Sequence, residues 1–225
     1  MLCTGNEYIT GGLKKILFRQ RNNHIDSILL KGVVASIYKS EDGYCWAGLR
    51  IGLVKIHPDF KQITLFKEFD GYIVRSIAGD GNGRILTGTN HGLFLQSEKV
   101  WKHIDRLNGL PDDYVNAVFF DRKNNSHWIG TNAGVCLLQY GRKVINFNDP
   151  LAKLRCNAFA CDRQNNVWIA TTAGLVKYAH GIFSLFNEKD RMPSDIYKLC
   201  YNEEEDKLYM LSPNQLLEID VAQFL

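Results

Sequence analysis

The sequence has few prolines, 5 in 225 residues, and it contains no apolar run of the roughly 18 residues that a membrane-spanning helix needs. Its first residues also lack the apolar stretch of about 7–15 residues that marks a secretory signal, so any export signal would have to lie upstream. The 27 basic and 24 acidic side chains nearly balance, whereas nucleic-acid binders usually carry a clustered basic face. We therefore expect neither a nucleic-acid partner nor a membrane segment in this chain.

The cysteines form no Cys-x-x-Cys motif and no spacing typical of metal ligands. We expect them to be buried as small apolar side chains, and we expect no metal site and no cofactor. Unpaired cysteines are more typical of a reducing compartment than of an exported protein. The six residues are Cys3, Cys45, Cys136, Cys156, Cys161 and Cys200.

An internal repeat of about 41 residues runs through the chain. The stretch WIGTNAGVCLL at residues 128–138 returns as WIATTAGLVKY at residues 168–178. A glycine followed by an aliphatic residue marks each copy, at intervals of 40, 40, 42, 40 and 41 residues, and the last copy has decayed to Gln215-Leu216. In five copies a bulky side chain lies six residues before this pair. The glycines are Gly12, Gly52, Gly92, Gly134 and Gly174, and the bulky residues are Trp46, Leu86, Trp128, Trp168 and Tyr209.

Each repeat predicts four short strands. Apolar and β-branched runs of 4–8 residues alternate with turns rich in Asp, Asn and Gly, and no stretch shows a convincing helical period. Four antiparallel strands in about 40 residues are typical of a β-propeller blade. We therefore predict an all-β protein, a β-propeller of four-stranded blades with about five to six repeats, forming a single domain over residues 1–225. The expected repeat units are 1–31, 32–71, 72–113, 114–153, 154–195 and 196–225.

The repeated residues have distinct expected roles. A single blade cannot bury both of its faces, so the tryptophans are expected to pack between neighbouring blades. The glycine is expected to allow the tight turn between the second and third strands. Asp80, Asp121 and Asp162 precede the hairpin turn in three repeats, and we expect them to bind turn amides rather than to form a carboxylate site.

The two ends of the pattern favour an open arc. The sequence predicts three strands, then four complete blades, then three further strands, which is more than a ring of five blades needs. An arc of a larger, seven-bladed ring is the preferred interpretation, and a distorted small ring is the alternative.

One stretch resembles a known repeat family. GLPDDYVNAVFFDRKNNSHWIGTNAGVCLL at residues 109–138 resembles the two-component regulator propeller repeat, and residues 154–178 are a weaker copy. In that family the repeats form the extracytoplasmic sensor region of hybrid two-component sensor histidine kinases, often ones that control polysaccharide use. The resemblance implies a periplasmic sensor domain with a carbohydrate-type ligand and attached domains or a dimer partner. No segment here looks like the kinase itself, and the cysteines leave a cytoplasmic location open.

One candidate ligand site is a column of polar residues early in the innermost strands. These residues recur at intervals of 40 or 41 within apolar runs, so they would line a central channel. They could bind a polar or anionic ligand, or they could bond only to channel water and backbone. The column consists of Ala35, Arg75, Asn116, Asn157 and Lys198, of which the last four are the polar candidates.

A second candidate site is formed by loops on one face of the blades. Tyrosines beside amides and acids suit sugar recognition, and they suit a protein partner equally well. The candidates are Arg50, Asn90, Asn132 and Thr172 in turns between second and third strands, with Tyr72 and Tyr114 in the connections between blades.

We expect no enzymatic activity, because the histidines occupy different blade positions without a repeated carboxylate beside them. The sequence favours a recognition module that senses an oligosaccharide or another polar small ligand. A protein-interaction scaffold is the alternative, and a propeller lyase is the third hypothesis. The six histidines are His24, His57, His91, His103, His127 and His180.

Overall fold

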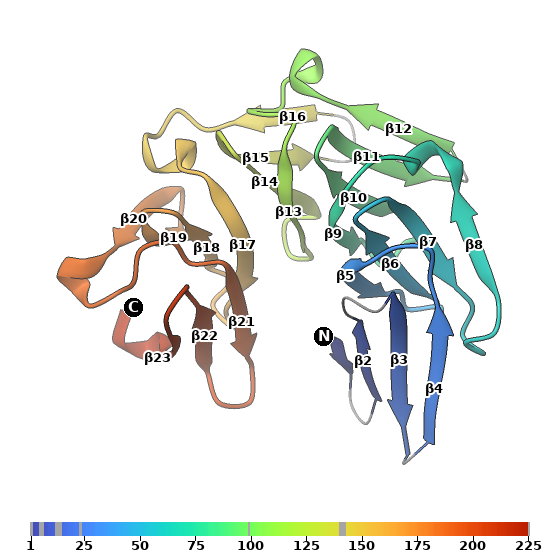
Figure 1. Cartoon of the computed structure of the whole chain (residues 1–225). Helices are drawn as coiled ribbons and strands as arrows, with labels where there is room; N and C mark the ends of the chain where they lie inside the picture. The colour runs from blue at the N-terminus through green and yellow to red at the C-terminus, as the bar shows by residue number, and fades with distance from the viewer. Residues whose placement is uncertain are drawn as a thin grey trace. The chain divides into compact units, whose positions relative to one another are not determined.

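The structure is a computed structural model that describes residues 2–4, 7–11, 15–22, 24–98, 100–139 and 143–224. These residues form β-strands, turns and short 3-10 segments with no α-helix among them, and the chain divides into two compact units, Met1–Ile104 and Asp105–Leu225. Each unit contains three small antiparallel sheets, which we number as blades 1–6 in chain order (Figure 1). The all-β class and the propeller-blade architecture are therefore confirmed. Among the described residues, no helix is long and apolar enough to cross a membrane.

Unit 1 holds blades 1–3, and within each blade every strand pairs with the next one along the chain. Blade 1 consists of β1 (Leu2–Thr4), β2 (Glu7–Gly11), β3 (Ile16–Arg21) and β4 (His24–Leu29). Blade 2 consists of β5 (Val34–Lys39), β6 (Cys45–Leu49), β7 (Gly52–Ile56) and β8 (Ile63–Phe66), followed by the 3-10 segment η1 (Lys67–Phe69). Blade 3 consists of β9 (Val74–Gly79), β10 (Ile85–Thr89), β11 (Gly92–Ser97) and β12 (Val100–Ile104).

Unit 2 begins with η2 (Arg106–Asn108) and holds blades 4–6 with the same strand order. Blade 4 consists of β13 (Val115–Asp121), β14 (Ser126–Thr131), β15 (Gly134–Gln139) and β16 (Lys143–Asn146), followed by η3 (Leu151–Lys153). Blade 5 consists of β17 (Cys156–Cys161), β18 (Val167–Thr171), β19 (Gly174–Ala179) and β20 (Ile182–Phe186), followed by η4 (Glu188–Asp190). Blade 6 consists of β21 (Lys198–Asn202), β22 (Lys207–Leu211) and β23 (Leu216–Asp220), followed by η5 (Val221–Phe224).

The first blade corrects the expected strand count. It has four strands instead of three, because residues before the first recognisable repeat position form β1 and pair with β2, Leu2 opposite Ile9. The first glycine–aliphatic pair, Gly12-Leu13, lies outside the described residues. Blade 6 has the three strands that the sequence predicts. Membership of a larger ring and a single domain over the whole chain stay predictions.

The turn between the second and third strands is built by the repeated threonine and glycine. Gly134 and Gly174 have φ of 123° and 132°, in the region that glycine favours. Thr131 Oγ1 donates to the carbonyl of Gly134 at 2.8 Å, and Thr171 Oγ1 donates to that of Gly174 at 2.7 Å. A Cβ on Gly134 would also lie only 2.8 Å from the Cα of Lys153. The expected role of this glycine is confirmed.

The aspartates before the hairpin turns bind turn amides, as expected. Asp80 Oδ1 accepts from the backbone N–H groups of Asn82 and Arg84, at 2.9 and 3.1 Å. Asp121 Oδ1 accepts from the backbone of Asn124, and Asp162 Oδ1 accepts from the backbone of Asn166. These carboxylates therefore serve, in place of backbone carbonyls, as the hydrogen-bond acceptors for N–H groups of each tight turn.

Tryptophans fill the space between successive blades of each unit. Trp46, Trp128 and Trp168 are 3%, 1% and 0% exposed, and each packs with residues of the following blade. The glycine two residues after the tryptophan lets the next innermost strand approach closely. A Cβ on Gly48 would lie 2.6 Å from a methyl of Val74, and one on Gly130 would lie 2.9 Å from the Cβ of Cys156. The expected inter-blade role of these tryptophans is confirmed.

Candidate functional site

The polar column falls on β-bulges in four consecutive blades. In β13, Val115 pairs with Thr131 and Ala117 pairs with Gly130, so Asn116 between them has no partner in the register. The same skip occurs at Ala35, at Arg75 and at Asn157. A bulge re-aims the side chain of the extra residue and increases the local twist. The recurring position is therefore one at which the innermost strand is bent.

Two of these amides are hydrogen-bonded to the neighbouring blade. Asn116 Nδ2 donates to the carbonyl of Cys156 in β17 at 3.0 Å, and Asn157 Nδ2 donates to the carbonyl of Ile196, next to β21, at 2.8 Å. Asn116 Nδ2 also donates to Asn132 Oδ1 at 3.0 Å. Asn116 Oδ1 is buried and has no hydrogen-bond donor among the described residues. For these two amides the N–H groups therefore bond to backbone carbonyls of the next blade, as the backbone-binding alternative expects.

The rest of the column is less uniform. Ala35 is exposed and Arg75 is half-buried. Lys198 is exposed at the start of β21, where the register is regular and there is no bulge. Contact of these side chains with a ligand stays a prediction.

In unit 1 the loop candidates Tyr72 and Asn90 lie at the same turn. Asn90 Oδ1 accepts from the backbone N–H of Ile73 at 2.8 Å, which ties the turn to the chain entering β9. The ring of Tyr72 lies 5.3 Å from that of His91 and 5.6 Å from that of Phe94. Arg50 is exposed in the corresponding turn of blade 2, where its backbone N–H donates to the carbonyl of Val33.

In unit 2 the structure brings Tyr114, Asn116 and Asn132 together. The backbone N–H of Asn132 donates to the carbonyl of Tyr114 at 3.2 Å, and its side chain accepts from Asn116. Thr172 lies in the equivalent turn of blade 5, and its carbonyl accepts from the backbone of Asp195 at 3.1 Å. The polar column and the loop turns therefore meet at Asn116 and Asn132.

Next to Thr172 lies a polar cleft that the sequence did not predict. We call it the unit 2 cleft. It has a volume of about 540 Å³ between the connection from blade 5 to blade 6 and the turn between β22 and β23. Arg191, with φ of 62°, and Glu188 supply opposite charges, and Tyr197 donates to Asp195 Oδ2 at 3.0 Å. That hydrogen bond raises the pKa of Tyr197. The signal in the sequence was the run RMPSD at residues 191–195, whose Pro, Ser and Asp are typical of a shaped loop.

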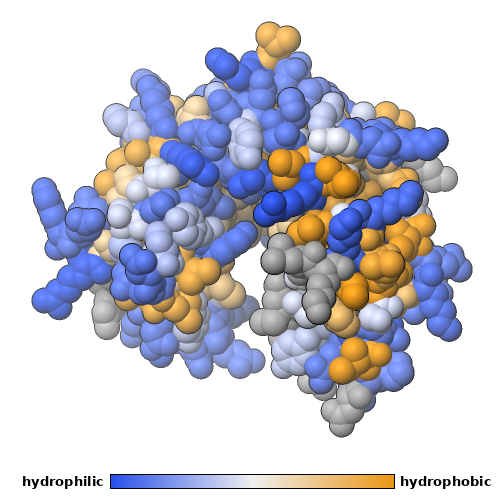
Figure 2. All heavy atoms as spheres, in the orientation of Figure 1, coloured by the Kyte–Doolittle hydropathy of each residue, from blue (hydrophilic) through white to orange (hydrophobic). Residues whose placement is uncertain are grey.

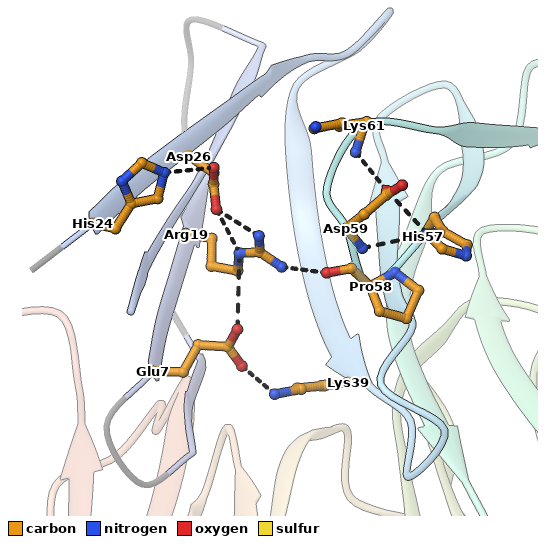
Figure 3. A network of polar contacts seen from close by, with 9 residues as sticks. All are labelled: Glu7, Arg19, His24, Asp26, Lys39, His57, Pro58, Asp59 and Lys61. Atoms are coloured by element: carbon orange, nitrogen blue, oxygen red, sulfur yellow. Dashed lines mark hydrogen bonds and ion pairs between the residues drawn. The ribbon is translucent and has the colours of Figure 1, made fainter. Parts of the chain in front are cut away.

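A second missed feature is an ion-pair network between blades 1 and 2 (Figure 3). Arg19 donates from Nε and Nη2 to the same oxygen, Asp26 Oδ2, at 3.0 and 2.5 Å, and from Nη1 to the carbonyl of Pro58 at 2.5 Å. Glu7, which is 7% exposed, pairs with both Arg19 and Lys39. The hydrogen bond from Arg19 lowers the pKa of Asp26 below its usual 3.8. Because each charged group in the network is paired with a group of opposite charge, we interpret the network as a contact that holds blades 1 and 2 together.

The cysteines and histidines are dispersed. Burial raises the pKa of the Cys45 and Cys136 thiols to about 12, and that of Cys161 to about 11, which suits inert core residues. Cys200 is exposed. In the described part of the chain, no three His, Cys, Asp or Glu side chains are grouped so that they could hold a metal ion.

A scan against protein-family models found no match, and a search of the curated proteins found none either. Among solved structures, the chain is similar to the extracellular domain of BT3049 from B. thetaiotaomicron, described as a hybrid two-component system. The identity is 21% and the TM-score 0.81, and the similarity covers 97% of this chain and 32% of that one. The likeness confirms the fold that the repeat resemblance implied.

Two other solved structures share the fold. PorZ, a surface component of the type-IX secretion system of Porphyromonas gingivalis, has 15% identity and a TM-score of 0.69, over 96% of this chain and 37% of that one. Virginiamycin B lyase from Staphylococcus aureus has 14% identity and a TM-score of 0.65, over 95% of this chain and 84% of that one. This chain spans roughly a third of the length of the BT3049 and PorZ chains.

Proposed function

We propose that this chain is a non-enzymatic recognition module that senses a carbohydrate-type or other polar ligand, as part of an extracytoplasmic two-component sensor. The observation that carries the proposal is the likeness to the extracellular domain of BT3049 over 97% of the chain. The repeat residues at 109–138 support the same family from an independent direction. Neighbouring sensor domains or a second subunit would then be its partners.

The polar loops supply the chemistry of recognition in this proposal. The unit 2 cleft offers Arg191, Glu188 and Asp195 beside the turn that holds Thr172. A sugar presents hydroxyl groups that both donate and accept, so a cleft with charges of both signs can satisfy them. Binding would produce a signal only if the ligand prefers one of two arrangements of the attached domains.

A thermal-shift screen of oligosaccharides and other polar metabolites tests the proposal. A ligand present at 100 times its Kd stabilises the folded state by about 2.7 kcal/mol. For a chain of this size, that gain corresponds to a rise in melting temperature of roughly 5–10 °C. Above Kd the rise should grow with the logarithm of the ligand concentration, and Arg191→Ala should reduce it. No shift across the whole panel would contradict ligand sensing.

The alternative is a protein-interaction scaffold, which one surface of unit 1 favours. The strand register places four large apolar or aromatic side chains on the outer face of blade 1, and Figure 2 shows apolar side chains gathered over the strands of unit 1. Exposed apolar patches mark interaction sites. A silent ligand screen together with a saturable protein partner would favour this alternative. The four residues are Tyr8, Phe18, Ile25 and Leu29, which are 46%, 42%, 64% and 71% exposed.

The lyase hypothesis draws only on the fold shared with virginiamycin B lyase. A lyase needs an acid and a base converging on its substrate. His24 and His57 each pair with a carboxylate, Asp26 and Asp59, and both pairs are sequence-local. His103 Nε2 instead contacts the carbonyl of His91 at 2.7 Å. These arrangements do not favour the lyase over a sensor.

A further inference from the structure

The sequence contains the dipeptide Asn-Gly twice, and both copies lie in turns. Asn82-Gly83 belongs to the hairpin between β9 and β10, and Asn108-Gly109 ends the 3-10 segment η2. Asn-Gly is the dipeptide in which asparagine loses its side-chain ammonia most readily. Glycine has no side chain that would hinder the attack of its backbone nitrogen on the asparagine amide. The local structure of each turn therefore decides whether its asparagine reacts.

The groups that would react at Asn82 are unobstructed. Asn82 and Gly83 are both exposed. Asp80 Oδ1 closes the turn by accepting from the backbone N–H groups of Asn82 and Arg84, but it does not accept from that of Gly83. Within the described ranges, neither the Gly83 N–H nor the Asn82 side-chain amide has a hydrogen-bond partner. Gly83 has φ of 84°, and no heavy atom lies within 4 Å of the point where a Cβ would stand.

The same groups at Asn108 are held by hydrogen bonds. The backbone N–H of Gly109, the nitrogen that would attack, donates to the carbonyl of Arg106 at 3.1 Å. Asn108 Oδ1 accepts from the backbone N–H of Asp105 at 3.1 Å, and Asp105 Oδ1 accepts from the backbone N–H of Asn108 at 3.2 Å, which is a capping box. Asn146 Nδ2 in β16 donates to the carbonyl of Gly109 at 2.9 Å. The attacking nitrogen and the amide that it would attack are therefore both fixed.

The reaction needs water and a base from the buffer, and no oxidant or reductant. The Gly83 backbone nitrogen gives its proton to the base and forms a bond to Asn82 Cγ. The bond between Cγ and Nδ2 breaks, and Nδ2 takes up a proton and leaves as ammonia. Residues 82 and 83 are then joined in a cyclic imide. Water adds to one of the two imide carbonyls and breaks one of its C–N bonds, which leaves an aspartyl or an isoaspartyl residue at position 82.

We propose that Asn82 is a site of spontaneous covalent modification by this route. The capping box protects Asn108, although its dipeptide is the same. The two sites thus differ through the hydrogen bonds of their turns. The proposal goes beyond ligand recognition and does not depend on the proposed function.

The modification changes a turn that touches the neighbouring blade. A Cβ on Gly81 would lie 2.9 Å from Glu41 Oε1, so the turn of blade 3 lies against the hairpin of blade 2. The product adds a carboxylate to a turn that already contains Asp80, and the Arg84 guanidinium is already paired with Asp80 Oδ2 at 2.7 Å. Like charges repel, so the added carboxylate weakens the contact with Glu41. The isoaspartyl form also inserts one CH₂ group into the backbone of the turn.

The test incubates the full chain in mildly alkaline buffer made with heavy-oxygen water and measures both sites by peptide mass spectrometry. Heavy oxygen marks the residues that react during the incubation. Asn82 should react about tenfold or more faster than Asn108, since two hydrogen bonds to the reacting groups of Asn108 must break first. Synthetic peptides of residues 78–86 and 104–112 are the control and should react at similar rates, because the turn structure is lost in both.

Two variants separate the sites. Asp105→Ala removes one bond of the capping box and should speed the reaction of Asn108 by about 3- to 10-fold without changing that of Asn82. Asn82→Gln should remove the reaction at position 82. The melting temperature of the incubated protein should fall, and Asn82→Gln should prevent this fall.

Three results would overturn the proposal. The first is an equal rate at the two sites of the folded protein. The second is an unreactive Asn82 in the folded protein while its peptide reacts. The third is an Asn108 rate that stays unchanged in Asp105→Ala, which would refute protection by the capping box. An unchanged melting temperature after full conversion at position 82 would contradict the weakened contact between blades 2 and 3.

Discussion

The buried tryptophans at equivalent repeat positions offer a direct measurement of one hydrogen bond. Trp46, Trp128 and Trp168 are all almost fully buried between blades, yet only Trp168 has an acceptor for its N–H among the described residues. Replacing each by phenylalanine keeps an aromatic wedge and removes the N–H. The loss of ring volume is similar in the three variants and should cost on the order of 1 kcal/mol each.

The hydrogen bond of Trp168 should make the loss of unfolding free energy larger in its variant than in the other two. A buried hydrogen bond to a charged group contributes about 1.5–3 kcal/mol to stability, and deleting its donor leaves the Asp162 carboxylate with one hydrogen bond fewer. Removing an unpaired donor, by contrast, relieves a desolvation cost of about 1–3 kcal/mol. We therefore expect Trp168→Phe to reduce the free energy of unfolding by at least about 2 kcal/mol more than Trp128→Phe does. Trp46→Phe should behave like Trp128→Phe.

The measurement is urea unfolding followed by far-ultraviolet circular dichroism, because tryptophan fluorescence would itself change. Trp128 and Trp168 belong to the same compact unit, so their variants are compared with each other first. A double-mutant cycle of Trp168→Phe with Asp162→Ala should show a coupling energy of about 1.5–3 kcal/mol. Equal losses for Trp168→Phe and Trp128→Phe, or no coupling in the cycle, would refute the reasoning.

Three further outcomes are expected. In a Cys3→Ser background, Cys200 should be the thiol that a maleimide labels in the native protein, since burial shields the core thiols and raises their pKa; labelling of several sites before unfolding would contradict this. Gly130→Ala should reduce the free energy of unfolding by about 1–3 kcal/mol in urea titrations through overpacking, and a neutral effect would contradict the close inter-blade contact. The lowered pKa of Asp26 means that its ion pair stabilises the folded state above pH 3.8 and is lost as pH falls through its folded pKa. Asp26→Asn should therefore lower the melting temperature at neutral pH and flatten its decline below pH 4, and parallel pH profiles would count against the network.

Much of the fold could be predicted because every blade needs the same turns and the same side chains packed against its neighbour, so the same residue types recur in each repeat. The tryptophan register, the Thr-x-x-Gly turn and the turn aspartates are local in sequence and recur every 40 or so residues. Their hydrogen bonds, such as Thr171 to Gly174, close within a few residues of the chain. The first strand, Leu2–Thr4, escaped the prediction because three residues are too short to show a strand pattern.

The candidate site was predicted only in part. The polar column was found from its spacing, but its position on β-bulges depends on pairing with the second strand, which residue type does not reveal. The unit 2 cleft was missed because Arg191 and Ser212 lie in different blades and meet only through packing. The Glu7–Arg19–Lys39 network was missed for the same reason.

The sequence alone determined that the chain forms four-stranded blades. Turn residues and the alternation of apolar and polar residues in strands act over a few residues, so they repeat in the sequence with the period of the blade. Only the tertiary structure decided which polar groups are satisfied. Trp46 and Trp168 have the same register and the same burial, and one acceptor at a distance of 2.8 Å distinguishes them. Whether a buried indole N–H is paired depends on the position of the acceptor side chain, which comes six residues earlier in the sequence. The length of the hairpin and the packing of the neighbouring blade set that position.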